Sequence, residues 1–327
     1  MKAVVHTRYG PPDVLQLADV ERPVPRADQV RIRIHATTVN RTDCAFRAGK
    51  PAPVRLFAGL RSPNNPIPGT EFAGVIDAVG RAVQSFAVGD RVFGRTSDER
   101  PGAHAEYLCV DEAAAVVHQP EGLSHVEAAA LCDGVMLANA YLRLIDFDRM
   151  PRIVINGASG SIGSAGVQLA KARGAEVTAV CKTDAITRVK ALGADHIIDY
   201  TQEDFTATDT IFDVVFDAVG KSSLRRCKRL LREGGIYVST ELGFLAQNPL
   251  LALRTWLFGG RIKVYFPLPK YGKAEAMYAK QLVERGQYQP LLDRTYRLDE
   301  IVDAHEYVET EGKVGNVVIT VVDDVPS

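Results

Sequence analysis

The chain has 327 residues, more than twice the roughly 150 of a typical domain, so we expect two domains. Hydrophobic residues make up 46% and charged residues 24%, which is typical of globular proteins and argues against long disordered segments. The net charge of −1 provides no overall basic field for nucleic acid or an anionic membrane.

The five cysteines are odd in number and form no C-x-x-C pair, which argues against a disulfide framework or a zinc knuckle. The N-terminus has too short an apolar run for an export signal, and no segment approaches the ~20 apolar residues that span a bilayer. We therefore expect a cytoplasmic protein without a membrane span.

The first 120 residues or so contain short β-branched or alternating runs separated by turn signals, and these predict a β-rich domain. The predicted strands are Lys2–His6, Gln29–Ala36, Phe72–Val79 and Arg91–Phe93.

From about residue 122 the pattern changes to alternating strands and helices, which predicts a doubly wound parallel sheet and an α/β fold. The strands are expected at Arg152–Asn156, Glu176–Val180, His196–Asp199, Val214–Asp217, Ile236–Thr240 and Ile262–Phe266. Two intervening helices are expected at Ile162–Arg173 and Ala185–Leu192.

The tail reads as helix Lys273–Arg285, a polar turn, helix Leu298–Glu309 and strand Asn316–Val322. This last strand has no partner left in the α/β unit, so we expect it to return to the first domain. The predicted organisation is a β-rich domain of residues 1–121 and 267–327, with an inserted nucleotide-binding domain of residues 122–266.

A glycine-rich turn follows the strand Arg152–Asn156 and has the spacing of the dinucleotide fingerprint, with alanine in its first position. Gly160 allows the backbone to approach a pyrophosphate, Gly163 allows the helix to pack on the strand, and the helix N-terminus favours an anion. The expected contacts of this turn are Ala158, Ser159, Gly160, Ser161, Ile162 and Gly163.

The end of the second strand indicates which nucleotide binds. An NAD site would have an acidic residue there, whereas this chain has Cys181, Lys182 and Thr183, which suit a 2′-phosphate. The Tyr200 hydroxyl is expected to reach the same phosphate. The alternative is that Lys182 is a solvated charge and Asp184 binds the ribose of NAD, but we favour NADP(H).

With both domains interpreted, the chain resembles the medium-chain dehydrogenase/reductase superfamily, in its zinc-independent quinone oxidoreductase branch. The resembling segments are ATTVNRTDCAFRAG (36–49), PGTEFAGVIDAVG (68–80), VGDRVFG (88–94), the glycine motif, LGADHIIDY (192–200), FDAVG (216–220) and KVGNVVIT (313–320). The resemblance implies a GroES-like domain, an inserted Rossmann domain and catalysis between them. It also implies further cofactor contacts at Val219, Gly220, Thr240, Phe266, Lys313 and Asn316.

Zinc-dependent members of the superfamily carry Cys, His and Cys ligands. The resemblance implies that the corresponding positions in this chain are occupied by Asn40, Thr70 and Asp133. Of these three, only the aspartate is a good zinc ligand, and the lobe with four cysteines is missing, so we expect no metal.

Without a Lewis acid, we expect hydride addition to a quinone or an α,β-unsaturated carbonyl, because these substrates are already electrophilic and need only positioning and a hydrogen-bond donor. Asn40 is predicted to donate to the carbonyl or enolate oxygen, although it is also a plausible turn residue. Thr42 takes the place of a relay hydroxyl, Asp43 orients the loop, and Asp133 lies near the nicotinamide. The alternatives are a zinc-free alcohol or ketone dehydrogenase, and a non-catalytic NADPH-binding sensor or RNA-binding protein.

The expected substrate is a small apolar carbonyl compound or quinone, with no nucleic acid partner. The basic residues of an expected helix over 222–232 are interpreted as a solvated face. The seven histidines show no ligand spacing. The strand over 261–266 ends the predicted sheet, and its edge often pairs between subunits in this superfamily, so we expect a homodimer.

Overall fold

The structure is a computed structural model that describes residues 1–310 and 312–322. The chain divides into two compact units. The first comprises residues 1–133, 271–285 and 290–327, and the second comprises residues 134–270 and 286–289. The second unit is therefore an insertion in the first, and the boundaries predicted at residues 121 and 267 stay predictions.

A seven-stranded sheet forms the first unit. Its order is β14-β15-β3-β4-β5-β7, and β6 pairs with β3. The strands are β3 (Gln29–Val39), β4 (Glu71–Val79), β5 (Arg91–Arg95), β6 (Tyr107–Asp111), β7 (Ala115–His118), β14 (Leu292–Arg297) and β15 (Asn316–Thr320). A separate hairpin joins β1 (Lys2–Val5) to β2 (Gln16–Asp19). The four strands predicted in this part of the chain are thus all present.

The core of this sheet consists of alternate side chains of its central strands, because successive residues of a strand point to opposite faces. Ile32 and Ile34 of β3, Phe72 and Ile76 of β4, and Val92 of β5 are fully buried together. The helices of the unit are α1 (Arg41–Ala48), α2 (Arg55–Ala58), α3 (His125–Ala129), α9 (Lys273–Glu284) and α10 (Ile301–Glu309).

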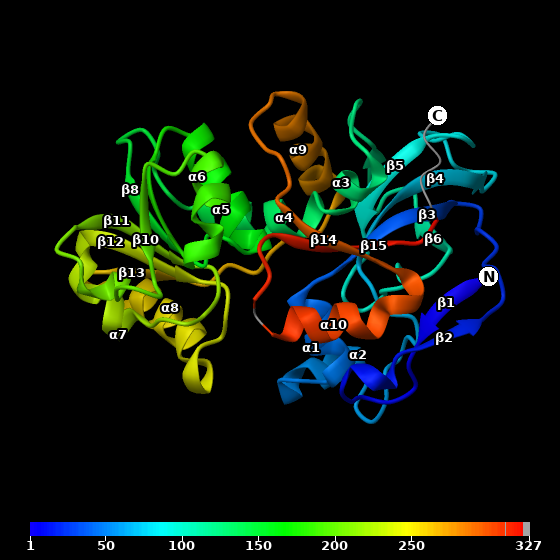
Figure 1. Cartoon of the computed structure of the whole chain (residues 1–327), viewed down its shortest axis with the longest axis horizontal. Coiled ribbons are helices and arrows are strands. Elements are labelled where there is room, and N and C mark those ends of the chain that lie inside the picture. The colour runs from blue at the N-terminus through cyan, green and yellow to red at the C-terminus, as the bar shows by residue number, and fades with distance from the viewer. Residues whose placement is uncertain (311, 323–327) are drawn as a thin grey trace. The chain divides into compact units, whose positions relative to one another are not determined.

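The C-terminal strand completes this sheet. β15 pairs antiparallel with β3 and parallel with β14, and Figure 1 shows the red β15 beside the blue β3. The predicted return of the tail is confirmed. β14, which lies in the segment interpreted as a polar turn, is an additional strand.

The second unit is a Rossmann-like domain with a six-stranded sheet of order β10-β9-β8-β11-β12-β13, every pair of which is parallel. The strands are β8 (Arg152–Asn156), β9 (Glu176–Cys181), β10 (His196–Asp199), β11 (Phe212–Asp217), β12 (Leu231–Ser239) and β13 (Lys263–Tyr265). All six predicted strands are present, and the α/β fold is confirmed.

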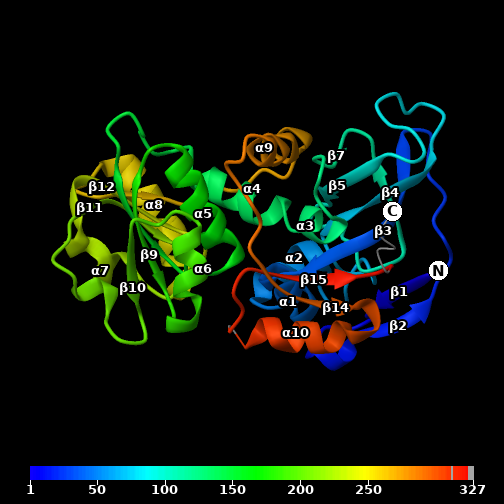
Figure 2. The same cartoon turned by 45° about the horizontal axis from the view of Figure 1, so that its top comes forward.

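Helices cover both faces of this sheet: α5 (Ser161–Ala172) and α6 (Ile186–Ala191) lie together on one face, and α8 (Gln247–Phe258) packs on β13 from the other (Figures 1 and 2). The helix α4 (Cys132–Leu142) begins in the first unit and ends in the second.

The prediction of one helix over residues 222–232 is wrong. α7 covers only Leu224–Cys227, a 3-10 turn follows, and Leu231 already belongs to β12. Leu230 and Leu231 both enter the core, one from the turn and one from the strand, and so imitate a helical apolar stripe.

In the described part of the chain, no helix is both long and apolar enough to cross a membrane.

Candidate functional site

The predicted nucleotide site lies on the second unit, in the turn that joins β8 to α5. Gly157 has φ +80°, a conformation that L residues with side chains rarely adopt. A Cβ on Gly163 would lie 2.1 Å from the Gly157 carbonyl oxygen, so the close approach of helix and strand requires glycine there. A Cβ on Gly160 would meet nothing closer than 3.6 Å, so this backbone is open to a ligand.

The N-terminus of α5 is suited to an anion. Its N-cap residue, Gly160, provides no side-chain cap, and the first turn contains no acidic residue. The hydroxyl of Ser161 is buried without a hydrogen-bond partner. Unpaired backbone N–H groups, the positive end of the helix dipole and this hydroxyl together fit a pyrophosphate.

Asp217, at the end of β11, shapes the neighbouring loop. Its buried carboxylate accepts hydrogen bonds from the Asn156 side chain at 2.9 Å and from the backbone N–H of Gly220 at 3.0 Å. Val219 in that loop lies against Gly157, since a Cβ there would be 2.3 Å from the valine Cγ1. Asn156 and Asp217 thus fix the turn and the loop together, a positioning role that the sequence analysis did not predict.

The loop after β9 holds the residues predicted to select the nucleotide. Lys182 Nζ lies 3.0 Å from a carboxylate oxygen of Asp184. The Thr183 hydroxyl donates to Asp199 at 2.5 Å, and the Tyr200 side chain is exposed. The loop therefore presents a lysine and a hydroxyl, each paired with a carboxylate, and Tyr200 joins it from the end of β10 through a backbone hydrogen bond to the Cys181 carbonyl oxygen.

The other predicted contacts are more scattered. Cys181 is buried, and desolvation raises the pKa of its thiol to about 11. The Thr240 N–H donates to the Asp217 carbonyl oxygen at 3.1 Å, whereas Phe266 lines an open hollow beside α8. Lys313 and Asn316 belong to the first unit, where their side chains donate to the carbonyl oxygens of Gly315 and Leu291 at 2.7 and 3.1 Å.

The predicted catalytic residues lie on the first unit. Asn40 caps α1 in a reciprocal capping box: its Oδ1 accepts from the Asp43 N–H at 2.8 Å, and Asp43 Oδ2 accepts from the Asn40 N–H at 2.9 Å. This arrangement commits the amide oxygen of Asn40 to the helix. The amide nitrogen, Nδ2, is buried and has no hydrogen-bond partner.

A buried charged network adjoins this cap. Glu71 accepts hydrogen bonds from the Thr38 hydroxyl at 2.6 Å and from the Asp133 backbone N–H at 2.7 Å. The carboxylate of Asp133 accepts from Arg95 Nε at 3.2 Å. The guanidinium of Arg95 also pairs with Asp98 and stacks on Tyr271 at 3.6 Å from the ring centroid.

The electrostatics of the network follow from its burial. Desolvation raises the pKa of Asp43 and of Glu71, and the negative charge of Asp133 acts in the same direction on both. Burial by itself lowers the pKa of Arg95, but the carboxylates of Asp133 and Asp98 outweigh it and raise this pKa. Arg95 is therefore a permanent buried cation beside the carboxylates of Asp98 and Asp133.

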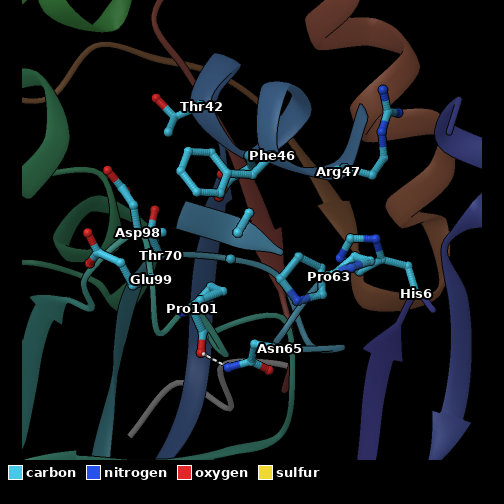
Figure 3. A pocket seen from close by; sticks show the side chains of 14 residues that line it. His6, Thr42, Phe46, Arg47, Pro63, Asn65, Thr70, Asp98, Glu99 and Pro101 are labelled. Atoms are coloured by element: carbon cyan, nitrogen blue, oxygen red, sulfur yellow. Dashed lines mark hydrogen bonds between the residues drawn. The ribbon is translucent and has the colours of Figure 1, made fainter. Parts of the chain in front are cut away.

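A small pocket opens beside this network, and the carboxylates of Asp43 and Asp98 line it. Figure 3 shows Thr42, Phe46 and Thr70 around it, with Asp98 and Glu99 on one side and Pro63 and Pro101 below. Its wall combines the predicted relay hydroxyl with an aromatic ring and several prolines. Such a mixture of apolar walls and few polar groups is typical of small-molecule sites.

Sequence reasoning missed two groups near this pocket. Arg95 directly follows the VFG motif, but nothing in the sequence marks it as buried. His6, His104 and His305 come from distant parts of the chain, and burial lowers the pKa of all three, that of His104 to about 4. Among the described residues, no group of three or more His, Cys, Asp or Glu side chains could hold a metal ion.

The comparisons with known proteins agree with this architecture. Residues 26–121 match the alcohol dehydrogenase GroES-like domain, and residues 192–319 match a zinc-binding dehydrogenase family. A 2-methylene-furan-3-one reductase of Solanum lycopersicum is 33% identical over 98% of this chain and 79% of its own length. A chloroplastic NADPH-dependent alkenal/one oxidoreductase of Arabidopsis thaliana is 31% identical over the same shares.

Among solved structures, the quinone oxidoreductase from Coxiella burnetii superposes with a TM-score of 0.87 at 29% identity, covering 98% of this chain and 99% of its own. The chain therefore belongs to the medium-chain dehydrogenase/reductase superfamily, in its quinone oxidoreductase and alkenal reductase branch. It is an oxidoreductase of that superfamily.

Proposed function

We propose that this protein reduces a quinone or an α,β-unsaturated carbonyl compound with NADPH, without a catalytic zinc. The reductase names of the relatives support the reaction class, and the α5 N-terminus and Lys182 support the cofactor. When bound, the nicotinamide supplies a hydride to the substrate. The side chains considered below bind and orient the substrate, and one of them relays a proton.

The observation that carries the proposal is the amide of Asn40. Its oxygen caps α1, and its nitrogen is a buried donor without an acceptor. A buried unsatisfied donor costs about 1–3 kcal/mol, which a substrate oxygen recovers by accepting from it. Negative charge grows on the carbonyl oxygen as an enone or quinone is reduced, so a fixed N–H donor favours that change.

The residues around Asn40 support a reaction without zinc. Asp133, the one good ligand among the three positions at which the zinc-dependent relatives hold metal, is already paired with Arg95. Thr70 offers only a hydroxyl. A positive guanidinium beside Asp133 opposes the binding of a divalent cation, and it provides positive charge near the developing anion.

Asp43 and Thr42 have separate tasks in this proposal. Asp43 accepts from the Asn40 backbone N–H and so holds the loop, which makes it a positioning residue. Thr42 lines the pocket and has a hydroxyl for relaying a proton to the reduced oxygen, with water as the alternative source.

Replacing Asn40 by serine tests the proposal, because serine also caps helices but lacks the amide donor. We expect kcat/KM with a quinone or a 2-alkenal to fall by roughly 10²–10³-fold, and the melting temperature to change little. The matched control is Ser124→Ala, which removes the N-cap of α3 and is expected to reduce stability by about 1 kcal/mol without affecting turnover. An Asn40→Ser variant as fast as the parent would exclude Asn40 as the donor.

A substrate panel separates the proposal from its alternatives. NADPH oxidation by quinones and 2-alkenals, without turnover of simple alcohols and ketones, is expected. Turnover of alcohols would favour a zinc-free alcohol dehydrogenase. Tight NADPH binding without oxidation by any acceptor would favour a non-catalytic binding protein.

A further inference from the structure

Thr70 has a buried hydroxyl that no group in the described part of the chain satisfies. The residue is 4% exposed, and its Oγ1 has no hydrogen-bond partner. It lines the pocket described above, and Figure 3 shows it on the same side as Thr42 and Asp98. A buried polar group without a partner costs stability, so a hydroxyl held in that state beside a pocket indicates a ligand that completes it.

The backbone around this hydroxyl is fixed. The Thr70 carbonyl oxygen accepts from the Thr96 N–H at 2.7 Å and from the Thr96 hydroxyl at 3.2 Å. The carbonyl oxygen of the preceding residue, Gly69, accepts from the N–H groups of Gly102 and Ala103 at 2.9 and 3.0 Å. Little further ordering is therefore needed for the Thr70 hydroxyl to bind a ligand.

The strand pairing brings Thr70 to the same end of the sheet as Asn40. β3 and β4 are antiparallel, with Thr37 opposite Phe72. Asn40 follows the last residue of β3, and Thr70 precedes the first residue of β4. The carboxyl group of Asp43, which accepts from the Asn40 N–H, lines the same pocket as Thr70. Asn40 Nδ2 and Thr70 Oγ1, both buried and without a partner among the described residues, thus lie at one end of this strand pair.

We propose that the Thr70 hydroxyl is a second hydrogen-bond donor to the substrate carbonyl oxygen, beside the amide of Asn40. This assignment rests on the proposed function. A carbonyl oxygen has two lone pairs and can accept from two donors. As hydride reaches the substrate, negative charge grows on this oxygen and both hydrogen bonds strengthen. Thr70 is then a catalytic residue that binds the oxygen and transfers no proton.

The charges around the pocket give a second donor its value. Asp43 and Asp98 line the pocket, and negative charge on either disfavours more of it on the substrate oxygen. Asp98 is paired with Arg95, which offsets part of this repulsion. A hydroxyl donor stabilises the oxygen without adding a further charge to the pocket.

Two variants of Thr70 test the assignment. Thr70→Val removes the hydroxyl and keeps the branched shape, whereas Thr70→Ser keeps the hydroxyl. For trans-cinnamaldehyde with NADPH, we expect Thr70→Val to lower kcat/KM by roughly 10- to 100-fold, the effect of one hydrogen bond to a charged group. The loss should fall mainly on kcat, because the bond strengthens as the charge grows. Thr70→Ser should keep most of the parent activity.

The matched control is Thr178→Val, which removes a buried hydroxyl from β9 of the second unit, away from the pocket of the first. It should turn over cinnamaldehyde as the parent does. Thermal unfolding of all the variants measures what each substitution costs the fold.

An infrared measurement reports the hydrogen bond without requiring turnover. The parent is mixed with NADP⁺, which has no hydride to give, and with cinnamaldehyde labelled with ¹³C at its carbonyl carbon. Each hydrogen bond that the oxygen accepts lowers the carbonyl stretching frequency. We expect this frequency to rise in Thr70→Val and to stay at the parent value in Thr70→Ser and Thr178→Val.

A double-mutant cycle tests whether the two donors share one oxygen. If they do, the variant that combines Asn40→Ser with Thr70→Val should lose less activity than the product of the two single losses, because the groups are coupled. Single losses that multiply would show that Thr70 and Asn40 bind different atoms, and would overturn the assignment.

An ordered water is the competing partner of the Thr70 hydroxyl. If water alone satisfies it, Thr70→Val will reduce cinnamaldehyde at the parent rate with an unchanged carbonyl frequency, and the assignment fails while the proposed function stands. A parent that binds cinnamaldehyde with the lowered frequency but reduces no quinone or enone would instead contradict the proposed function and leave the Thr70 contact in place.

Discussion

At the scale of single residues, the ion pair between Lys182 and Asp184 decides how well the second unit can distinguish its nucleotides. The two side chains are 3.0 Å apart, and the carboxylate is two-thirds exposed. A 2′-phosphate would compete with this carboxylate for the lysine, because both are anions. Nucleotide preference therefore depends on both residues.

We predict that Lys182→Ala weakens NADPH binding by about 1.5–3 kcal/mol, a ten- to hundredfold change in Kd, because it removes a charged hydrogen bond. NADH binding should be nearly unaffected. Asp184→Asn should instead tighten NADPH binding, since it removes the competing charge. Titration calorimetry with both nucleotides measures these effects.

The matched control is Lys190→Ala, which removes an exposed lysine of α6 and should change neither affinity. Equal losses for NADPH and NADH in Lys182→Ala would mean that the lysine supports the loop or the pyrophosphate instead.

The carboxyl groups near Asn40 give a second prediction at this scale. Desolvation first, and then Asp133, raise the pKa of Glu71 above its value in the unfolded chain. A raised carboxyl pKa contributes stability that is complete below the unfolded pKa and is lost as pH rises through the folded pKa. We expect the parent to lose stability relative to Glu71→Gln with rising pH, by at most about 1.4 kcal/mol per pH unit.

Urea unfolding of both proteins from about pH 5 to about pH 8 measures this difference, since most of the other titrating groups cancel. The control Glu233→Gln, an exposed residue of β12, should follow the parent at every pH. A stability difference between the parent and Glu71→Gln that does not change with pH would show that Glu71 has the same pKa in the folded and unfolded states.

Only part of this residue-scale site could be predicted from the sequence. Asn40, Asp43 and Asp133 could be identified because motifs mark their positions. The structure brings them close enough for Asn40 and Asp133 to affect the pKa of Asp43. Arg95 and the histidines at 6, 104 and 305 could not, because burial and contacts between distant segments make them unusual. The direction of the Asn40 amide depends on its capping box with Asp43, and this contact is known only from the three-dimensional structure.

At the scale of elements, the β8–α5 turn offers two glycines with opposite constraints. A methyl group on Gly163 would overlap the Gly157 carbonyl oxygen, whereas Gly160 has φ −78° and open space around it. Alanine at position 163 must displace the backbone. Alanine at position 160 fits within the protein and obstructs only a ligand that approaches the turn.

We therefore predict that Gly163→Ala destabilises the fold by about 1–3 kcal/mol, as expected for overpacking. Gly160→Ala should keep the parent stability but weaken NADPH and NADH binding equally, because the pyrophosphate is common to both. Thermal unfolding and nucleotide titration of the two variants separate these effects. A Gly160→Ala variant with undiminished affinity for both nucleotides would exclude close backbone approach at this position.

Helices and strands could be predicted from the sequence wherever a run of apolar residues lies within a single element. The six strands of the parallel sheet are such cases, since short apolar runs are flanked by glycine or polar turns. β14 was missed because its residues are mostly polar and half exposed, so its pairing with β15 provides the stability that its side chains do not. The expected helix over 222–232 fails for the converse reason, because two elements share one apolar pattern.

At the scale of the whole molecule, β13 is one of the two edge strands of the second unit's sheet and pairs only with β12 among the described strands. An open edge presents unpaired N–H and C=O groups to another chain. A two-fold axis at this edge would continue the sheet from one subunit into the next. Leu253 and Trp256 of α8 line one hollow together with residues of β13, so a contact at this edge would extend onto the helix.

We predict a homodimer in solution, with a mass by light scattering of about twice the 35.6 kDa of one chain at micromolar concentration. The Leu253→Glu variant should dimerise more weakly, because Leu253 lines the hollow beside β13. Exchange of the β13 amide hydrogens should be slow in the dimer and become faster on dilution, since pairing across the axis would protect them. A monomeric mass at micromolar concentration, or β13 amides that exchange equally fast at every concentration, would contradict pairing through this edge.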